Sequence, residues 1–360
     1  MSRITSVLLT ILVLLGAMGV QAEVPPVLTL HLAPYFAAGP VIDGKLDDAA
    51  WRTAPENSTF YKYWTTAAEA TPLRTAFRLG YDAKGLFLGA NMYEKEPDKI
   101  KATIAQRQDP RLWTDDCAEI YVDSAGSGTG YRKFTINALG TTQTLYRMDM
   151  ANSDPTWAPE GWQAAAVRDA EGWTFEMYIP WEILGRPAEA GDLWKLCFVR
   201  FSWSSGGWAG GGLVTSALGG NYNNPDRFGW LLFLPRDAGG DTNALAQTIA
   251  ERVPGDWLVS LPEAVVMKSS GEVKATSMKD LVASLRTEVQ AELEDCRQLS
   301  EGDSVAATGL DAVDKELAGV PAQVADAVGF QLAMGTLAKI SSKIEDIRYT
   351  HMLTALLAAG

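Results

Sequence analysis

The sequence predicts a mainly β fold, an antiparallel two-sheet sandwich of jelly-roll or immunoglobulin type, followed by an α-helical C-terminal region. Short segments that alternate polar and apolar residues recur through the first two thirds of the chain, separated by Gly- and Pro-containing turns. Eleven of the 12 tryptophans lie between Trp51 and Trp230. After residue 240 the chain becomes rich in Ala, Leu, Val, Glu and Lys, and apolar residues recur at helical spacing.

These composition changes divide the chain into three parts. Residues 1–22 resemble a secretory signal peptide, with Arg3 at a positive start, the apolar run VLLTILVLLGAMGV and the small-residue sequence VQA before Glu23. The apolar run is shorter than the roughly 20 residues that span a membrane. We expect cleavage, no membrane insertion afterwards, and a mature protein that is secreted, periplasmic or on the cell surface. Residues 23–236 are predicted to form the sandwich and residues 237–360 the helical region.

Charge and residue usage exclude several classes of function. The net charge of -13 argues against nucleic acid, which is bound through Lys and Arg contacts to phosphate. The presence of only two histidines, His31 and His351, argues against a Ser-His-Asp site and a multi-histidine zinc site. Three cysteines, an odd number, argue against a disulfide framework. A neutral ligand, or a cation held by carboxylates, fits this composition.

The predicted strands follow one another from residue 75 to residue 234. TAFRLGYD alternates between two faces, and a turn leads from it to GLFLGANMYE. The later predicted strands are CAEIYVD, YRKFTINALG, TTQTLYRM, GWQAAAVRD, GWTFEMYIPW, LWKLCFVRFSW and RFGWLLFL. We expect Trp51, Trp173 and Trp181 to lie in the core of this sandwich.

The C-terminal region is predicted to be a helical hairpin. Leu281, Leu285, Val289 and Leu293 recur at helical spacing within a helix expected over residues 277–300. Ser277 or Thr276 is its expected N-cap. A second helix is expected over residues 321–359, with breaks at two glycines. The hairpin is either a packing appendage or a site of self-association or contact with a protein partner.

Two of the predicted strands offer one apolar and one polar face. In CAEIYVD, Ala118, Ile120 and Val122 point to one side and Glu119 to the other. If this strand pairs with KFTIN, Glu119 and Asn137 share one surface. A carboxylate and an amide in this arrangement suit the neighbouring hydroxyls of a sugar ring.

Two aromatic residues are placed to flank this polar surface. Trp113 precedes the CAEIYVD strand in a loop, and Tyr222 lies in the Gly- and Asn-rich loop GGNYNNPDRFG. The C–H groups of a pyranose stack on an aromatic ring, which adds apolar burial and attraction to its negative face. We therefore predict Trp113 and Tyr222 as platforms for a sugar.

Six segments occur in the order seen in family 9 carbohydrate-binding modules, and the chain resembles that family over about residues 33–235. The segments are VIDGKLDDAAW, GYDAKGLFLGA, LWTDDCAEIYVD, KFTINALG, GWTFEMYIPWEIL and NNPDRFGWLLFL. The resemblance implies a β-sandwich with bound calcium that clamps the end of a glucan or xylan chain between two aromatic rings. It places these rings on Trp113 and Tyr222, the hydrogen-bonding carboxylate on Glu119 and the amide on Asn137. A basic residue expected at position 135 is Thr135 instead, which leaves the specificity open.

The acidic residues beside this segment have two interpretations. Asp115 and Asp116 could bind calcium, which prefers several oxygen ligands from acidic loops. Glu94 follows GLFLGANMY at a position where the family tends to carry an acidic residue. The alternative for all three is a role in turns and caps.

The sequence therefore predicts a non-catalytic protein that binds an oligo- or polysaccharide, with structural calcium. One alternative is a glycoside hydrolase, or an accessory subunit of a polysaccharide-degrading system, in which Glu119 pairs with Asp115 or Asp116. Others are a surface or adhesion protein that assembles through its helices, and a haem-binding sandwich with Met148 and Met150 as ligands.

Overall fold

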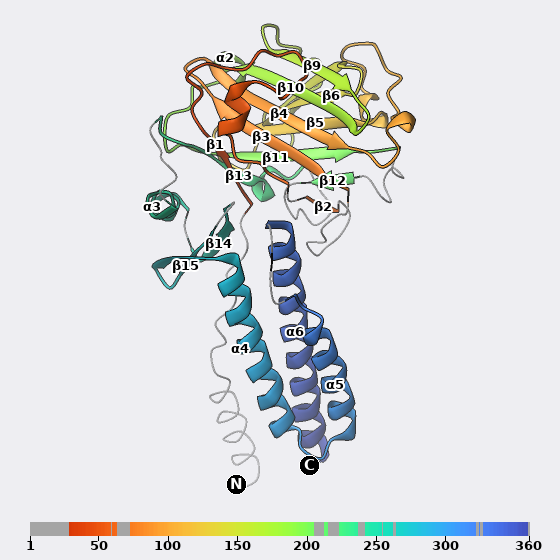
Figure 1. The fold of residues 1–360 in the computed structure, drawn as a ribbon, viewed down its shortest axis with the longest axis vertical. Coiled ribbons are helices and arrows are strands. Elements are labelled where there is room, and N and C mark those ends of the chain that lie inside the picture. Colours follow the sequence, from red (N-terminus) through yellow and green to blue (C-terminus); the bar gives the residue numbers. More distant parts are fainter. Residues whose placement is uncertain are drawn as a thin grey trace.

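A computed structural model shows a β-sandwich, a small three-stranded sheet with one helix, and a helical bundle (Figure 1). It describes residues 29–58, 60–62, 73–204, 212–214, 223–236, 242–253, 255–261, 264–321, 324 and 327–358. The predicted fold class, an antiparallel sandwich followed by helices, is confirmed. The predicted signal peptide lies outside the described residues. Within them, no helix is both long and apolar enough to cross a membrane.

The sandwich consists of two sheets. The larger has the order β1 (Leu30–Ala33), β13 (Gly229–Phe233), β11 (Leu193–Phe201), β5 (Cys117–Asp123), β6 (Tyr131–Asn137), β7 (Thr142–Arg147) and β8 (Ser153–Asp154), with β12 (Gly212–Val214) joining β11 to β2 (Tyr61–Lys62). The smaller has the order β3 (Thr75–Tyr81), β4 (Gly85–Tyr93), β10 (Gly172–Pro180) and β9 (Gln163–Arg168). Short helical turns are η1 (Ala49–Thr53), η2 (Pro97–Lys99), η3 (Leu112–Thr114), α2 (Trp181–Leu184) and η5 (Pro225–Arg227). Among these strands, β1 and β13 form a parallel pair, and the other pairs are antiparallel.

Strand alternation buries one face of each sheet in a common core. Ala118, Ile120 and Val122 of β5 lie in this core, as the sequence predicts. The same core holds Trp173 and Trp181, whereas Trp51 is buried against the outer face of the smaller sheet beside Phe36 and Phe87. The opposite face of β5, which carries Glu119, points away from this core.

A buried arginine links the two sheets. Arg200 of β11 is fully buried and donates to the backbone carbonyls of Arg74 and Tyr93, both from the smaller sheet's side of the core. Its Nη2 also lies 2.7 Å from Glu94 Oε1, and Ser202 donates to the other carboxylate oxygen of Glu94. Because an unpaired charge in such a place would be strongly destabilising, these contacts fix how the sheets pack.

The IDGKLDDAAW segment is fixed by a single carboxylate. Glu176 of β10 accepts hydrogen bonds from Trp51 Nε1 at 2.7 Å and from the backbone N–H groups of Asp43 and Gly44. Burial raises the pKa of Glu176, and these three hydrogen bonds oppose that shift. Gly44 has φ +90°, and a Cβ there would lie 3.0 Å from the backbone of Ala166, so only glycine fits.

Residues 242–276 differ from the prediction of a purely helical region after residue 236. They form α3 (Thr242–Arg252) and a separate sheet of β14 (Trp257–Ser260), β15 (Val265–Ser269) and β16 (Glu272–Thr276). Trp257 and Ile249 pack here against Leu32 of β1 and Leu232 of β13. The outer face of the sandwich edge is therefore covered by this unit, a contact that a composition boundary could not predict.

The last helices form a bundle of three rather than the predicted hairpin. They are α4 (Met278–Leu299), α5 (Ser304–Ala318) and α6 (Ala327–Ala358), and Figure 1 shows them side by side. Ser277 caps α4 as expected, accepting a hydrogen bond from Asp280 N. The prediction missed α5, whose start is set by Gly302 at φ +88° and by the N-cap Asp303. Gly335 does not interrupt α6.

Candidate functional site

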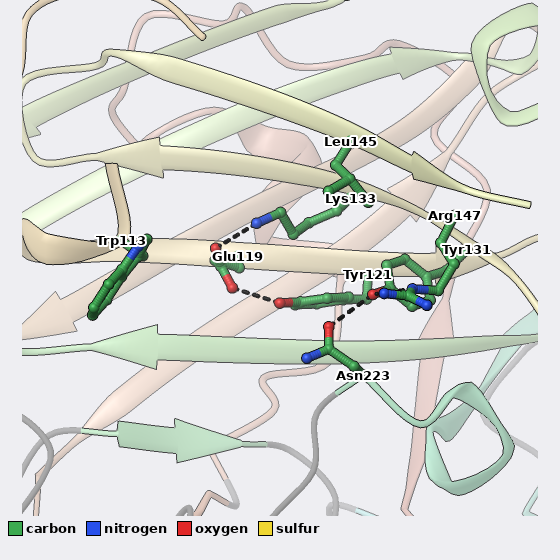
Figure 2. A pocket seen from close by; sticks show the side chains of 8 residues that line it. All are labelled: Trp113, Glu119, Tyr121, Tyr131, Lys133, Leu145, Arg147 and Asn223. Carbon is green, nitrogen blue, oxygen red and sulfur yellow. Dashed lines mark hydrogen bonds and ion pairs between the residues drawn. The ribbon is translucent and has the colours of Figure 1, made fainter. Parts of the chain in front are cut away.

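A cavity of about 190 Å³ lies on the face of the larger sheet that points away from the sandwich core. Its described lining is Trp113, Glu119, Tyr121, Tyr131, Lys133, Leu145, Arg147 and Asn223 (Figure 2). Six of these residues have odd numbers on β5, β6 and β7, because every second side chain of a strand points to the same face. Figure 2 shows Trp113 at one end, next to Glu119, and Arg147 at the other.

Glu119 is 2 % exposed and is held by three donors. Lys133 Nζ lies 2.8 Å from Oε1, Tyr121 Oη donates to Oε2 at 2.5 Å, and Thr135 Oγ1 donates to Oε1 at 3.4 Å. The carboxylate is therefore oriented, and its charge is offset by a lysine. Lys133 is a basic residue on the same face as Thr135, two residues before the position at which the resemblance implied one.

A second polar group lies at the other end of the cavity. Tyr131 Oη donates to Asn223 Oδ1 at 2.8 Å and accepts from Arg147 Nε at 3.1 Å. Burial raises the pKa of Tyr131, and the charge of Arg147 opposes this shift. Tyr131 is therefore a neutral hydroxyl at physiological pH, and its ring packs edge-on against Tyr121 with centroids 5.0 Å apart.

Trp113 is 38 % exposed although it lies in a well-anchored turn. Its neighbour Leu112 is fully buried in η3, and its own backbone carbonyl accepts a hydrogen bond from Trp203 Nε1 at 2.9 Å. The rings of Trp113 and Trp203 lie 6.0 Å apart. The structure thus places a partly exposed indole at the mouth of a polar cavity, and its role as a stacking platform stays a prediction.

Asn137 does not line the cavity. Its Nδ2 donates to Ile104 O and to Asp115 Oδ2, both at 2.9 Å, and its Oδ1 accepts from Leu139 N and Thr141 N. The amide therefore has its full set of hydrogen bonds within the protein. The structure corrects its predicted role as a sugar ligand to one of supporting the turn between β6 and β7.

Tyr222, the second predicted platform, lies outside the described residues, so its role stays a prediction. The next residue, Asn223, does line the cavity. The Gly- and Asn-rich loop that the sequence singles out therefore reaches the site through at least this residue.

The two aspartates of LWTDDC are buried hydrogen-bond acceptors. Asp115 accepts from the backbone N–H groups of Thr103 and Ile104 and from Asn137. Asp116 accepts from the backbone N–H groups of Lys101, Trp203 and Ser204. Burial raises the pKa of Asp116, and these hydrogen bonds oppose the shift. Asp115 and Asp116 therefore hold the loops around the start of β5 in place.

The predicted calcium ligands do not fit a metal ion. N–H groups donate to Asp115 Oδ2 and to both oxygens of Asp116, the Thr103 hydroxyl donates to Asp115 Oδ1, and Glu94 is paired with Arg200, whereas calcium needs free oxygen ligands. Among the described residues, no three His, Cys, Asp or Glu side chains are grouped so that they could hold a metal. We correct the assignment of these three residues, whereas calcium binding by the protein stays a prediction.

Comparison with known proteins decides the family. The family model described as carbohydrate family 9 binding domain-like matches residues 42–234, more than half of the chain. The chain belongs to this family. The match spans the strands that build the cavity, from the IDGKLDDAAW segment to β13. The family assignment thereby confirms the resemblance found in the sequence.

Solved structures of family 9 modules are also similar to this chain. A module from Caldicellulosiruptor kristjanssonii in complex with glucose has 17 % identity and a TM-score of 0.43, over 58 % of this chain and 98 % of that one. The same organism's module in complex with cellotriose has 16 % identity and a TM-score of 0.42, over 58 % of this chain and 95 % of that one. A comparison with curated proteins found no match.

Sequence reasoning missed most of the cavity lining. The missed residues are Tyr121, Tyr131, Lys133, Leu145, Arg147 and Asn223. The two-residue alternation of side chains along a strand could have identified them. A residue two or four positions from Glu119, or opposite it on a paired strand, lies on the same face of the sheet.

Proposed function

We propose that this protein is secreted and binds, without catalysis, a neutral saccharide of glucan or xylan type in the cavity of the larger sheet. Membership of a carbohydrate-binding family supports this proposal. The observation that carries it is the partly exposed indole of Trp113 beside the oriented ion pair of Glu119 and Lys133.

The two parts of the cavity match the two kinds of surface on a sugar. A pyranose face stacks on Trp113, which removes apolar C–H groups from water. Its hydroxyls then donate to Glu119 and accept from Lys133. Hydrogen bonds to charged partners contribute about 1.5 to 3 kcal/mol each, so a preformed ion pair gives both affinity and orientation.

The size of the cavity favours a single sugar unit. At about 190 Å³ it is smaller than pockets for drug-sized ligands, which measure roughly 300 to 1,000 Å³. We infer that one monosaccharide unit, such as the end of a chain, stacks at the Trp113 end of the cavity, and that the rest of the chain lies beyond that unit. Tyr222 is the proposed second aromatic contact.

A hydrolase would need two carboxylates at the site, roughly 5 to 10 Å apart across the bond that breaks. Glu119 is the one carboxylate in the described lining of the cavity. Asp115 and Asp116 are fully buried and engaged by N–H donors. These observations favour binding over hydrolysis.

The test compares Trp113→Ala with Trp230→Ala, a second half-buried tryptophan of the larger sheet that lies outside the described cavity lining. Wild-type protein is screened on a glycan array, with and without a calcium chelator, and its best ligand is titrated by calorimetry. We expect Trp113→Ala to lose at least tenfold in affinity and Trp230→Ala to retain it. Unchanged affinity of Trp113→Ala for every sugar would refute the site, and release of reducing sugar that Glu119→Gln abolishes would refute the non-catalytic function.

A further inference from the structure

Arg147 lines the cavity without an ion-pair partner among the described residues, although its charge adds to the hydrogen bonds that lower the pKa of Asp149. Arg147 lies on β7 opposite Tyr131 of β6. Glu119 of β5 lies opposite Thr135, which is four residues from Tyr131 along β6. We propose that Arg147 binds the carboxylate of a uronic acid, carried as a substituent or as the neighbouring unit of the bound saccharide. This inference rests on the proposed function and adds an acidic group to its ligand.

The guanidinium of Arg147 is held in place by neutral acceptors. Its Nε donates to Tyr131 Oη at 3.1 Å, and its Nη1 donates to the backbone carbonyl of Met150 at 3.1 Å. Its carbon also lies 5.7 Å from the centre of the Tyr131 ring. Two of its five N–H donors are thus used for orientation, and the described residues offer no protein acceptor to Nη2.

No acidic side chain of the described residues forms an ion pair with Arg147. Lys133, the other cation of the cavity, is paired with Glu119. Asp149 lies two residues along the chain, but its carboxylate accepts from the backbone of Ala151 and from Asn152. The described lining of the cavity therefore carries two cations and one carboxylate, within a chain whose net charge is -13.

A carboxylate is the ligand group that this arrangement favours. Guanidinium and carboxylate form charge-assisted hydrogen bonds between opposite charges, which are stronger than those that a guanidinium makes to neutral acceptors such as sugar hydroxyls. Four residues of an antiparallel strand span about 13 Å, so one ring stacked on Trp113 does not also fill the place beside Arg147. The neutral ring and the acidic group thus occupy opposite ends of the cavity (Figure 2).

The experiment uses two matched probes, xylotriose and xylotriose substituted with glucuronic acid, titrated into the full chain by calorimetry. We expect the acidic probe to bind wild type at least tenfold more tightly in 20 mM salt, and this preference to shrink in 500 mM salt because exposed charges are screened. Arg147→Gln should bind both probes with equal affinity, because the preference for the acidic probe depends on the guanidinium. Arg147→Lys should keep part of the preference, and Arg168→Gln on β9 of the other sheet should keep all of it.

Equal binding of the two probes by wild type would overturn the inference and leave the proposed function standing. A parallel loss for both probes in Arg147→Gln, with Arg147→Lys behaving the same way, would also overturn it, because Arg147 would then support the cavity only. Absence of binding to these probes and to every sugar of the array would refute the proposed function itself.

Discussion

Lys133 Nζ and Glu119 Oε1 lie 2.8 Å apart at the base of the cavity, and their side chains are only 13 % and 3 % exposed. Burying two charges costs free energy that their mutual attraction offsets only when the geometry is good and further hydrogen bonds are made. Here Tyr121 and Thr135 supply those bonds to the carboxylate. A pair of this kind contributes little to stability, and we interpret it as an arrangement for recognising a ligand.

The first prediction concerns the charge of Glu119. Glu119→Gln keeps the shape of the side chain but leaves Lys133 without its carboxylate, so we expect a loss of about 10- to 100-fold in saccharide affinity, in keeping with the 1.5 to 3 kcal/mol of a charged hydrogen bond. Calorimetric titration measures it. Tyr121→Phe, which removes one donor from the same carboxylate, is the milder companion. Equal affinities for wild type and Glu119→Gln would contradict a role for this carboxylate in binding.

The sequence predicts the site where alternation alone determines it. Glu119 faces away from Ala118 and Ile120, and the structure confirms that face. Asn137 shares the alternation but lies where β6 turns towards β7, so local donors and acceptors engage its amide before any ligand does. Glu119 lines the cavity and Asn137 does not because they lie at different positions along their strands. The alternation of side chains carries no information on that position.

The acidic residues show a second limit of the sequence. Asp115 and Asp116 have the composition of a cation site, yet backbone N–H groups from residues 101, 103, 104, 203 and 204 meet their oxygens. These donors come from segments far apart in the chain. A similar long-range contact, between Arg200 and Glu94, engages the third predicted metal ligand.

The helical character of the C-terminal region was predicted correctly, but the number of its helices was not. The apolar stripe of α4 is long and regular, and its N-cap was correctly placed at Ser277 or Thr276. In contrast, α5 is short, and the strands β14 to β16 are four or five residues each, so composition dominated by Ala and Glu concealed them. The strands β14 and β15 pack against Leu32 and Leu232 of the sandwich, a contact that no local pattern reveals.

The second prediction concerns the buried link between the sheets. Arg200→Met should destabilise the protein by roughly 3 to 5 kcal/mol, because the buried carboxylate of Glu94 then loses its guanidinium partner. The double variant Arg200→Met, Glu94→Gln should recover much of that loss. Chemical unfolding of the four proteins measures the coupling. Additive effects of the two single changes would show that the pair is not coupled.

The third prediction separates backbone strain from crowding at Gly44. Gly44 and Gly161 both have φ +90°, but a Cβ at Gly44 would approach Val167 and the backbone of Ala166, whereas at Gly161 nothing lies within 4 Å. Gly161→Ala should cost about 1 to 2 kcal/mol from the left-handed backbone alone. Gly44→Ala should cost more, because it also displaces the turn that donates to Glu176. Equal losses of unfolding free energy would show that crowding at Gly44 contributes nothing.

The last prediction concerns pH and His31. Burial lowers the pKa of His31 to about 4 from its ordinary 6.5, while the hydrogen bond to Asn57 opposes that shift. Between pH 6.5 and pH 4 the unfolded chain binds a proton that the folded protein does not, so stability falls as the pH falls through this range. The difference of about 2.5 pKa units corresponds to about 3 kcal/mol. Urea unfolding of wild type and His31→Gln at pH 7.5, 5.5 and 4.5 isolates this loss, because the carboxylates that titrate in the same range are common to both proteins. We expect the wild-type stability to fall more steeply than that of His31→Gln, and parallel pH profiles would show that His31 takes up its proton without unfolding.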